Sequence, residues 1–267
     1  MKKLIFSLYR GIFARKMFYG FNKMLIRLAY RGMGILNYES DKSSGEDYLI
    51  KQILPKIIKS KSVIFDVGAN VGNFSRTLTV KFPDAQIYSF EPHPQNFQKL
   101  LALKDKVNCV EMALGSKTET AEIFDYSSGK ASEHASLIKE VITDIHHSDV
   151  HRIEIKVESL DNFLENHQIV EIDFLKIDTE GFEIDVLQGA EKSLAAGKVK
   201  VILFEFNSMN TLRKVFFREF EAILGEYRLY RLLPKGILPL ENEEIIFKEI
   251  FAFQNILAVS RKIDLKI

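Results

Sequence analysis

The chain has 267 residues, which is enough for one large α/β domain with an additional segment and a substantial core. Its 46% hydrophobic and 27% charged residues are ordinary for a globular protein, and a net charge of +1 excludes the overall positive field that attracts nucleic acid. The single cysteine, Cys109, excludes an internal disulfide and fits a reducing compartment, so we expect a cytoplasmic location.

The first 34 residues form a basic segment without an acidic residue. Lysines and arginines alternate there with aliphatic and aromatic residues. No apolar run is long enough to span a bilayer, and no signal-peptide cleavage site follows Lys2 and Lys3. A helix of this composition either lies on an anionic membrane surface, here at the inner face of the membrane, or packs on the flank of its own domain. We therefore predict a helical extension over residues 1–45 and a main domain over residues 46–267.

From residue 61 onward, strand and helix patterns alternate along the chain. Short apolar runs that end at glycine, proline or acidic residues indicate buried strands, and this alternation predicts a mostly parallel sheet with helices on both faces. We expect strands at 63–67, 86–91, 107–112, 121–126, 152–158, 172–177, 199–206, 227–233 and 251–259, with the last two as an antiparallel pair at one edge. We expect helices at 72–82, 94–103, 183–196 and 211–224, and a polar excursion near the site between residues 126 and 152.

The first candidate site residues lie in the glycine loop DVGANVG, directly after the first predicted strand. Gly68 allows a sharp turn, and Gly72 allows the following helix to approach closely. Asn70 and Asn73 stand where a dinucleotide fingerprint has glycine, and the carboxylate of Asp66 disfavours a bound phosphate. The loop therefore favours a ligand with cationic groups, such as the ammonium and sulfonium of S-adenosylmethionine. The alternative is a generic tight turn.

The second candidate is Glu91, which ends the second predicted strand about 20 residues after the glycine loop. A carboxylate in this position commonly accepts hydrogen bonds from both hydroxyls of a ribose. This feature is shared by sites for S-adenosylmethionine and for NAD, so it does not separate the two cofactors. The structural alternative is a solvated acid at a strand end.

The third candidate is the segment LKIDTEGFE, in which a lysine interrupts an apolar strand and acids surround a glycine. Lys176 on a strand buried on both faces needs an ionic partner, which is one of the acids that follow it or Glu205. Asp178 is expected to face the cleft, where a carboxylate can orient a hydroxyl, take its proton or hold a metal. A structural ion-pair network is the alternative for Lys176 and Glu183.

Together these segments resemble the FkbM family of S-adenosylmethionine-dependent methyltransferases. The resemblance covers about residues 47–206 and rests on VIFDVGANVGNFS, YSFEPHPQNF, NCVEMALG and FLKIDTEGFEIDVLQGA. It implies an α/β fold with the seven-stranded, Rossmann-like, mostly parallel sheet of class I methyltransferases, whose last strand is antiparallel. It also implies S-adenosylmethionine as cofactor and O-methylation of a hydroxyl on a sugar, a surface polysaccharide precursor or a related natural product.

The resemblance also implies roles for single residues. The methionine part of the cofactor is assigned to Asp66, Gly68, Asn70 and Gly72, its ribose to Glu91, and its adenine to the segment that ends at Ala113. Asp178 faces the acceptor and is the first candidate for the general base. His134, in the segment SEHASL, and His93 are the reserves, because a histidine titrates near neutral pH.

Two other function classes fit parts of the pattern. The first is an NAD-dependent oxidoreductase or epimerase on a Rossmann fold, against which Asp66 and Asn70 count. The second is a non-catalytic family member that serves as a scaffold, against which the intact cofactor motifs count. The expected partner is a small-molecule or glycan acceptor and not a nucleic acid, and the oligomeric state stays open. We expect no metal at the histidines at 146–151, which lack the following glutamate of a zinc-protease helix, and we assume none at Asp178, Glu180 or Glu205, although these acids leave a divalent ion open.

Overall fold

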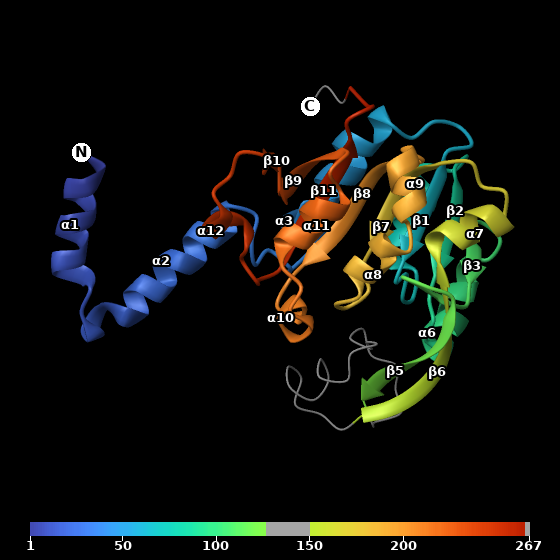
Figure 1. The fold of residues 1–267 in the computed structure, drawn as a ribbon, viewed down its shortest axis with the longest axis horizontal. Coiled ribbons are helices and arrows are strands. Elements are labelled where there is room, and N and C mark those ends of the chain that lie inside the picture. Colours follow the sequence, from blue (N-terminus) through green and yellow to red (C-terminus); the bar gives the residue numbers. More distant parts are fainter. Residues whose placement is uncertain (127–149, 265–267) are drawn as a thin grey trace.

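A central eight-stranded sheet organises the protein in a computed structural model that describes residues 1–126 and 150–264 (Figure 1). The strand order is β10-β9-β11-β8-β7-β1-β2-β3. The strands are β1 (Val63–Val67), β2 (Gln86–Phe90), β3 (Asn108–Val110), β7 (Ile172–Ile177), β8 (Val199–Phe206), β9 (Tyr227–Leu233), β10 (Gly236–Pro239) and β11 (Gln254–Ser260). Strands β3, β2, β1, β7 and β8 run parallel, and β11 enters antiparallel between β8 and β9.

This arrangement is the predicted class I methyltransferase fold with one strand more than expected. Strand β10 forms a hairpin with β9 and takes the edge of the sheet, where Pro239 is tolerated because one side of an edge strand needs no hydrogen-bond donor. The predicted antiparallel pairing of β9 with β11 is confirmed, but this pair does not form the edge. The third parallel strand, expected at 107–112, covers only Asn108–Val110, and the chain then enters β4 (Ala113–Gly115) of a second sheet.

The second sheet, with three strands in the described residues, lies beside the carboxyl end of the first. Its order is β4-β6-β5, with β5 at Glu119–Tyr126 and β6 at Val150–Ser159. The antiparallel pairing of β5 with β6 confirms the strands expected at 121–126 and 152–158. The predicted polar excursion between them, including His134, lies outside the described residues.

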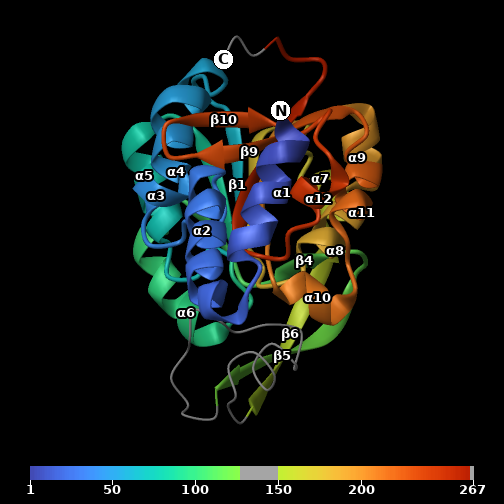
Figure 2. The same ribbon diagram turned by 90° about the vertical axis from the view of Figure 1, so that its left-hand side faces the viewer.

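Helices cover both faces of the large sheet (Figures 1 and 2). One face carries α7 (Leu160–Asn166), α8 (Glu183–Gln188), α9 (Glu191–Ala196) and α11 (Phe217–Ile223). The other carries α5 (Asn73–Lys81) and the short turns α3 (Asp41–Ser44), α4 (Glu46–Tyr48), η2 (Leu49–Ile53) and η3 (Leu54–Lys56). Successive residues of β1 alternate between two cores: Phe65 packs on the first face, and Ile64 on the second. The remaining short helices are α6 (Pro94–Leu100), η4 (Leu101–Leu103), α10 (Met209–Arg213) and α12 (Ile245–Lys248).

Two predicted helices are each broken into two. The stretch expected at 183–196 bends at Gly189, where an added Cβ would lie 1.9 Å from the carbonyl oxygen of Gly115. Helix α8 therefore ends where the two sheets meet, and α9 begins anew. The stretch expected at 211–224 is interrupted by Lys214, which has a φ of +56° and caps α10 in the left-handed conformation. The first break lies at a contact between segments far apart in the sequence, whereas the second is a local left-handed cap.

The extension begins with α1 (Lys2–Phe13), η1 (Lys16–Phe18) and α2 (Tyr19–Gly32), which project away from the sheet (Figure 1). Within the described part of the chain, neither α1 nor α2 contains a buried residue. The interpretation in which these helices pack on the flank of their own domain is therefore wrong. No helix among the described residues combines the length and the apolar character that crossing a bilayer requires.

Candidate functional site

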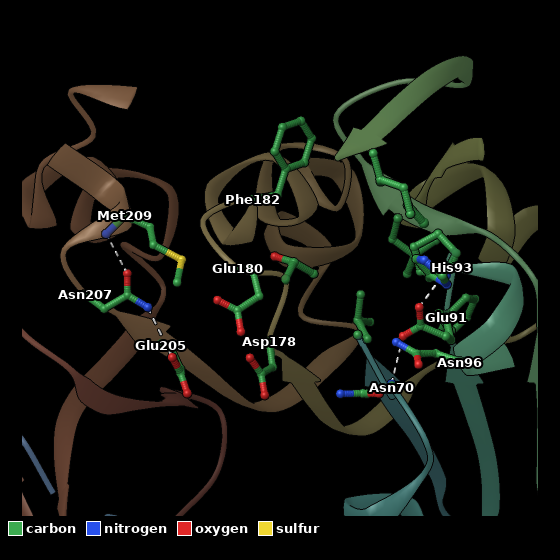
Figure 3. Close-up of a pocket in the computed structure, with 18 of the residues that line it drawn as sticks. Asn70, Glu91, His93, Asn96, Asp178, Glu180, Phe182, Glu205, Asn207 and Met209 are labelled. Atoms are coloured by element: carbon green, nitrogen blue, oxygen red, sulfur yellow. Dashed lines mark hydrogen bonds between the residues drawn. The ribbon is translucent and has the colours of Figure 1, made fainter. Parts of the chain in front are cut away.

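A cavity of about 730 Å³ opens where β1, β2, β7 and β8 end (Figure 3). Its volume is in the range of about 300–1,000 Å³ that holds small-molecule ligands. Five of the predicted site residues line it together, although they come from distant parts of the chain: Gly68, Asn70, Glu91, Ala113 and Asp178. This convergence follows from the parallel sheet, which brings the carboxyl ends of its strands to one edge.

The two glycines of the loop perform different tasks. Gly68 has a φ of +79°, and an added Cβ would lie 1.8 Å from the carbonyl oxygen of Asp178. Its small size lets the ends of β1 and β7 approach each other. Gly72 has a φ of +82° and does not line the cavity; its Cα faces the side chains of Leu100 and Leu103. The sequence predicted that Gly72 allows the following helix to approach closely. The close approach observed at Gly72 is to Leu100 and Leu103 of α6 and η4.

Asn70 and Glu91 are joined by a hydrogen bond at the floor of the cavity. The backbone N–H of Asn70 donates to Glu91 Oε2 at 2.8 Å, and the N–H of His93 donates to Oε1, also at 2.8 Å. Burial raises the pKa of Glu91 to about 7, although these two N–H groups oppose the shift. The side-chain oxygen of Asn70 is buried and accepts no hydrogen bond from any residue that the structure describes. The floor therefore offers two acceptor groups to a ligand.

The wall beside Glu91 is apolar. Ala113 is buried at the start of β4, and Met112, Leu114 and Ile123 line the cavity next to it. Such a surface suits the flat face of an aromatic ring. His93 begins helix α6, and its Nδ1 accepts the N–H of Gln95, so this side chain caps a helix.

Asp66 lies below the cavity and does not line it. Its Oδ2 accepts a hydrogen bond from Ser75 at 2.5 Å, and its Oδ1 lies 4.0 Å from Lys176 Nζ. Burial raises the pKa of Asp66, against the opposing effects of Lys176 and Ser75. A direct contact between Asp66 and a ligand stays a prediction. The observed contacts of Asp66 link the end of β1 to Ser75 and to Lys176.

Lys176 finds its predicted ionic partner in Asp178. The Nζ of Lys176 lies 2.7 Å from Asp178 Oδ2 and 5.0 Å from the centre of the Phe74 ring. Burial alone would lower the pKa of Lys176, but the carboxylates of Asp178, Asp66 and Glu46 outweigh it and raise the pKa. The lysine therefore stays charged beneath the cavity. Glu46 was not predicted from the sequence, because it reaches this group from α4, which is far from Lys176 along the chain.

Three acidic side chains meet at the cavity end opposite Glu91. Asp178, Glu180 and Glu205 point toward one another (Figure 3). Asn207 Nδ2 donates to Glu205 Oε2 at 3.1 Å. Burial, followed by the negative charges of Asp178 and Glu180, raises the pKa of Glu205 well above its ordinary value. Within residues 1–126 and 150–264, no group of His, Cys, Asp or Glu side chains has the arrangement of a metal site.

Glu183 has a structural position behind this acidic group. Its Oε1 accepts hydrogen bonds from the N–H of Thr179 at 2.9 Å, from the Thr179 hydroxyl at 3.0 Å and from the N–H of Gly181 at 3.1 Å. These bonds shape the loop that carries Glu180. Glu183 therefore has a structural role, as the alternative to a catalytic one proposed. Its partners are backbone N–H groups and a hydroxyl, however, and not the expected ion-pair partner.

Four aromatic rings that line the cavity, called the aromatic rim below, were not predicted from the sequence. These rings are Tyr38, Phe182, Phe251 and Phe253. Tyr38 and Phe253 contact each other edge to face with their centres 6.0 Å apart. The only available signal was the position of Phe182 inside the acidic segment, since the other three rings are distant in sequence.

Comparison with known families decides the identity. The profile of the methyltransferase FkbM domain matches residues 66–232, which is more than half of the chain. This chain belongs to the FkbM methyltransferase family. The family predicted from the glycine loop and the LKIDTEGFE segment is confirmed, and the NAD-dependent alternative is set aside. As an FkbM methyltransferase, the protein uses S-adenosylmethionine as its cofactor.

Curated relatives share this domain at low identity. Methyltransferase 1 of Beauveria bassiana is 29% identical over 148 residues, covering 49% of this chain and 59% of that protein. The 2-O-methyltransferase NoeI of Sinorhizobium fredii is 21% identical over 198 residues, covering 70% and 81%. The hexuronic acid methyltransferase AglP of Haloferax volcanii is 24% identical over 166 residues, covering 61% and 63%. The match thus spans less than two-thirds of the Beauveria and Haloferax proteins.

The residues of this FkbM methyltransferase fit the cofactor. The free acceptor oxygen of Asn70 suits an ammonium group, and the carboxylate of Glu91 has lone pairs left for ribose hydroxyls. The apolar wall at Ala113 suits the adenine ring. These individual assignments stay predictions.

We expect cofactor affinity to depend on pH through Glu91. Only the ionised carboxylate can accept both ribose hydroxyls, so protonation below a pKa of about 7 should weaken binding. For one linked proton, affinity for S-adenosylhomocysteine should fall about 30-fold between pH 8 and pH 5.5. Calorimetric titration across this range measures the effect.

The control for this experiment is Glu46→Gln, because burial also raises the pKa of Glu46 to about 7 but Glu46 does not line the cavity. Glu91→Gln should abolish the pH dependence and weaken binding, whereas Glu46→Gln should retain the dependence. Equal affinity at both pH values in the unmodified chain would contradict the role of Glu91.

Proposed function

We propose that this methyltransferase transfers the methyl group to a hydroxyl oxygen of a sugar, a surface polysaccharide precursor or a related natural product. The observation that carries the proposal is the acidic group of Asp178, Glu180 and Glu205 at the acceptor end of the cavity. Carboxylates orient hydroxyl groups through hydrogen bonds and can take their protons. Two relatives support a sugar acceptor by name, NoeI as a 2-O-methyltransferase and AglP as a hexuronic acid methyltransferase.

The two carboxylates nearest the strand ends have different tasks in this proposal. Asp178 is held in place by its ion pair with Lys176, so it orients the acceptor hydroxyl. Glu205 accepts a hydrogen bond from Asn207, and burial together with the negative charges of Asp178 and Glu180 raises its pKa, which makes its carboxylate a better proton acceptor. The general base therefore moves from Asp178, the first candidate, to Glu205, with Asp178 as the positioning partner.

Methyl transfer to a hydroxyl requires mainly that the enzyme aligns the donor with the acceptor oxygen and removes the hydroxyl proton. S-adenosylmethionine would supply, when bound, a methyl group on a sulfonium whose C–S bond breaks to leave a neutral thioether. The acceptor oxygen forms its bond to the methyl carbon as its proton passes to Glu205. Correct orientation alone contributes up to about 10 kcal/mol to such a displacement. The aromatic rim of Tyr38, Phe182, Phe251 and Phe253 excludes water from the apolar side of the acceptor.

The direct test is transfer of a labelled methyl group by the purified chain. Neutral hexoses, hexuronic acids and nucleotide sugars serve as acceptors, and mass spectrometry with NMR identifies the methylated atom. A methyl ether on a sugar oxygen supports the proposal. Methylation at nitrogen or sulfur would overturn it, and so would cofactor binding without transfer to any acceptor, which is the behaviour of a scaffold member.

We expect Glu205→Gln to lower kcat by about 100- to 10,000-fold, because it removes the proton acceptor and keeps the side-chain shape. Affinity for S-adenosylhomocysteine should stay within about threefold, because Glu205 lies at the opposite end of the cavity from Glu91. The acidic limb of the kcat profile of the unmodified chain, where the rate rises as Glu205 ionises, should be absent in the variant.

The matched control is Glu154→Gln on the exposed face of β6, which should leave kcat unchanged. A Glu205→Gln variant with normal kcat would return the base assignment to Asp178.

A further inference from the structure

We infer that α1 and α2 form a docking element for a bilayer surface that carries anionic lipid headgroups. This element, residues 2–32, is called the basic arm below. It lies outside the cavity and the sheet, and the inference is independent of the proposed acceptor.

Helix α1 separates apolar and basic side chains on opposite faces. Leu4, Leu8 and Ile12 recur every four residues and therefore lie on one face of the helix. They are 67%, 59% and 51% exposed, so the domain does not cover them. Lys3 and Arg10 lie on the other side of the helix. A helix with this division and an exposed apolar face is suited to lie in the plane of a membrane interface.

Helix α2 repeats the same division. Phe21, Leu25 and Leu28 follow the spacing of one helix face, and all three are exposed. Lys23, Arg27 and Arg31 form a separate row at intervals of four residues. The second helix thus presents its own apolar face beside a row of cations.

The basic arm is held together at its bend. Phe13 contacts the rings of Tyr9, Phe18 and Phe21, with centres 4.8, 5.0 and 5.5 Å apart. Asn22 also donates to the carbonyl oxygen of Phe13 at 3.0 Å. These contacts join the two helices at their shared end, and Figure 2 shows α1 and α2 extending from this bend.

Charge complementarity selects the anionic bilayer over other occupants. The first 34 residues carry eight lysines and arginines and no acid, so two copies of the basic arm repel each other. Nucleic acid would use the cations but would leave the aliphatic faces in water. An anionic bilayer can bind the cations and the apolar faces at the same time, because its headgroups attract the cations and its acyl chains bury the apolar side chains.

The test is co-sedimentation of the full chain with phosphatidylcholine vesicles, with and without phosphatidylglycerol. We expect binding to the anionic vesicles and a partition coefficient roughly tenfold or more lower on neutral ones. Replacing Leu4, Leu8 and Ile12 with serine should lower binding to anionic vesicles by roughly tenfold or more. The matched control replaces three exposed apolar residues elsewhere with serine, namely Val80, Val170 and Ile246, and should bind as the unmodified chain does.

Affinity for S-adenosylhomocysteine should be the same in all these variants, which shows that each is folded. Equal vesicle binding by the Leu4, Leu8 and Ile12 variant and its control would overturn the inference. So would an unmodified chain that binds neither kind of vesicle, that prefers single-stranded RNA to anionic vesicles, or that uses the basic arm to form dimers instead.

Discussion

Replacing Lys176 with methionine is expected to destabilise the protein by about 3–5 kcal/mol, because it leaves buried carboxylates without their cation. The Nζ of Lys176 is 2.7 Å from Asp178 and 4.0 Å from the fully buried Asp66. Methionine keeps an unbranched apolar side chain of nearly the same length, so most of the loss reports the missing charge, including its contact with the Phe74 ring. Chemical denaturation monitored by circular dichroism measures the free energy of unfolding.

The pH dependence of this variant distinguishes the electrostatic explanation from a packing defect. Without Lys176, the pKa of Asp66 rises further, so the folded state binds a proton that the unfolded state binds only at lower pH. The stability of Lys176→Met, relative to the unmodified chain, should therefore increase as the pH falls from neutral toward 5. Lys51→Met removes an exposed pair with Asp47 and should cost less than about 1 kcal/mol. Similar losses in both variants would contradict the role of Lys176.

Gly68→Ala is expected to disrupt both the fold and cofactor binding. The added Cβ would lie 1.8 Å from the carbonyl oxygen of Asp178, and the φ of +79° is unfavourable for any residue with a Cβ. Left-handed strain of roughly 1–2 kcal/mol and overpacking of about 1–3 kcal/mol together predict a loss of about 2–5 kcal/mol. Separation of β1 from β7 should also displace Asn70 and abolish saturable binding of S-adenosylhomocysteine.

The control is Gly236→Ala in the edge strand, where an added Cβ would meet no atom within 4 Å. Its free energy of unfolding should change by less than about 0.5 kcal/mol. If Gly68→Ala matched this control in stability and binding, the close approach of the two strand ends would not be required.

Local patterns in the sequence were sufficient to predict the parallel sheet and one half of the site. Apolar runs that end at glycine or acidic residues mark β1, β2 and β7, and the strand ends of a parallel sheet meet at one edge. Gly68, Asn70, Glu91 and Asp178 could therefore be placed together in advance. Each of these residues ends a predicted strand or lies in the loop directly after one, and this position in the sequence is enough to predict that they lie close together.

The features that were missed depend on segments that meet only after folding. Glu46 joins the charges around Lys176 from α4, and the raised pKa of Glu205, which was named in advance only as a possible partner of Lys176, is set by burial. Tyr38 and Phe253 form part of one rim although they are far apart in sequence. The break at Gly189 results from the backbone of Gly115. None of these contacts leaves a periodic signal in the chain.

The short connection between the basic arm and the cavity has a kinetic consequence. Residues 33–35 join α2 to Leu36, which lines the cavity and donates its N–H to the carbonyl oxygen of Phe253. When α2 lies on a bilayer, the acceptor site is tethered at a short distance from the lipid surface. An acceptor anchored in that bilayer would then reach the site by diffusion in two dimensions and at a high effective concentration. Turnover would follow the surface density of such an acceptor, whereas a freely dissolved sugar would gain nothing from the membrane.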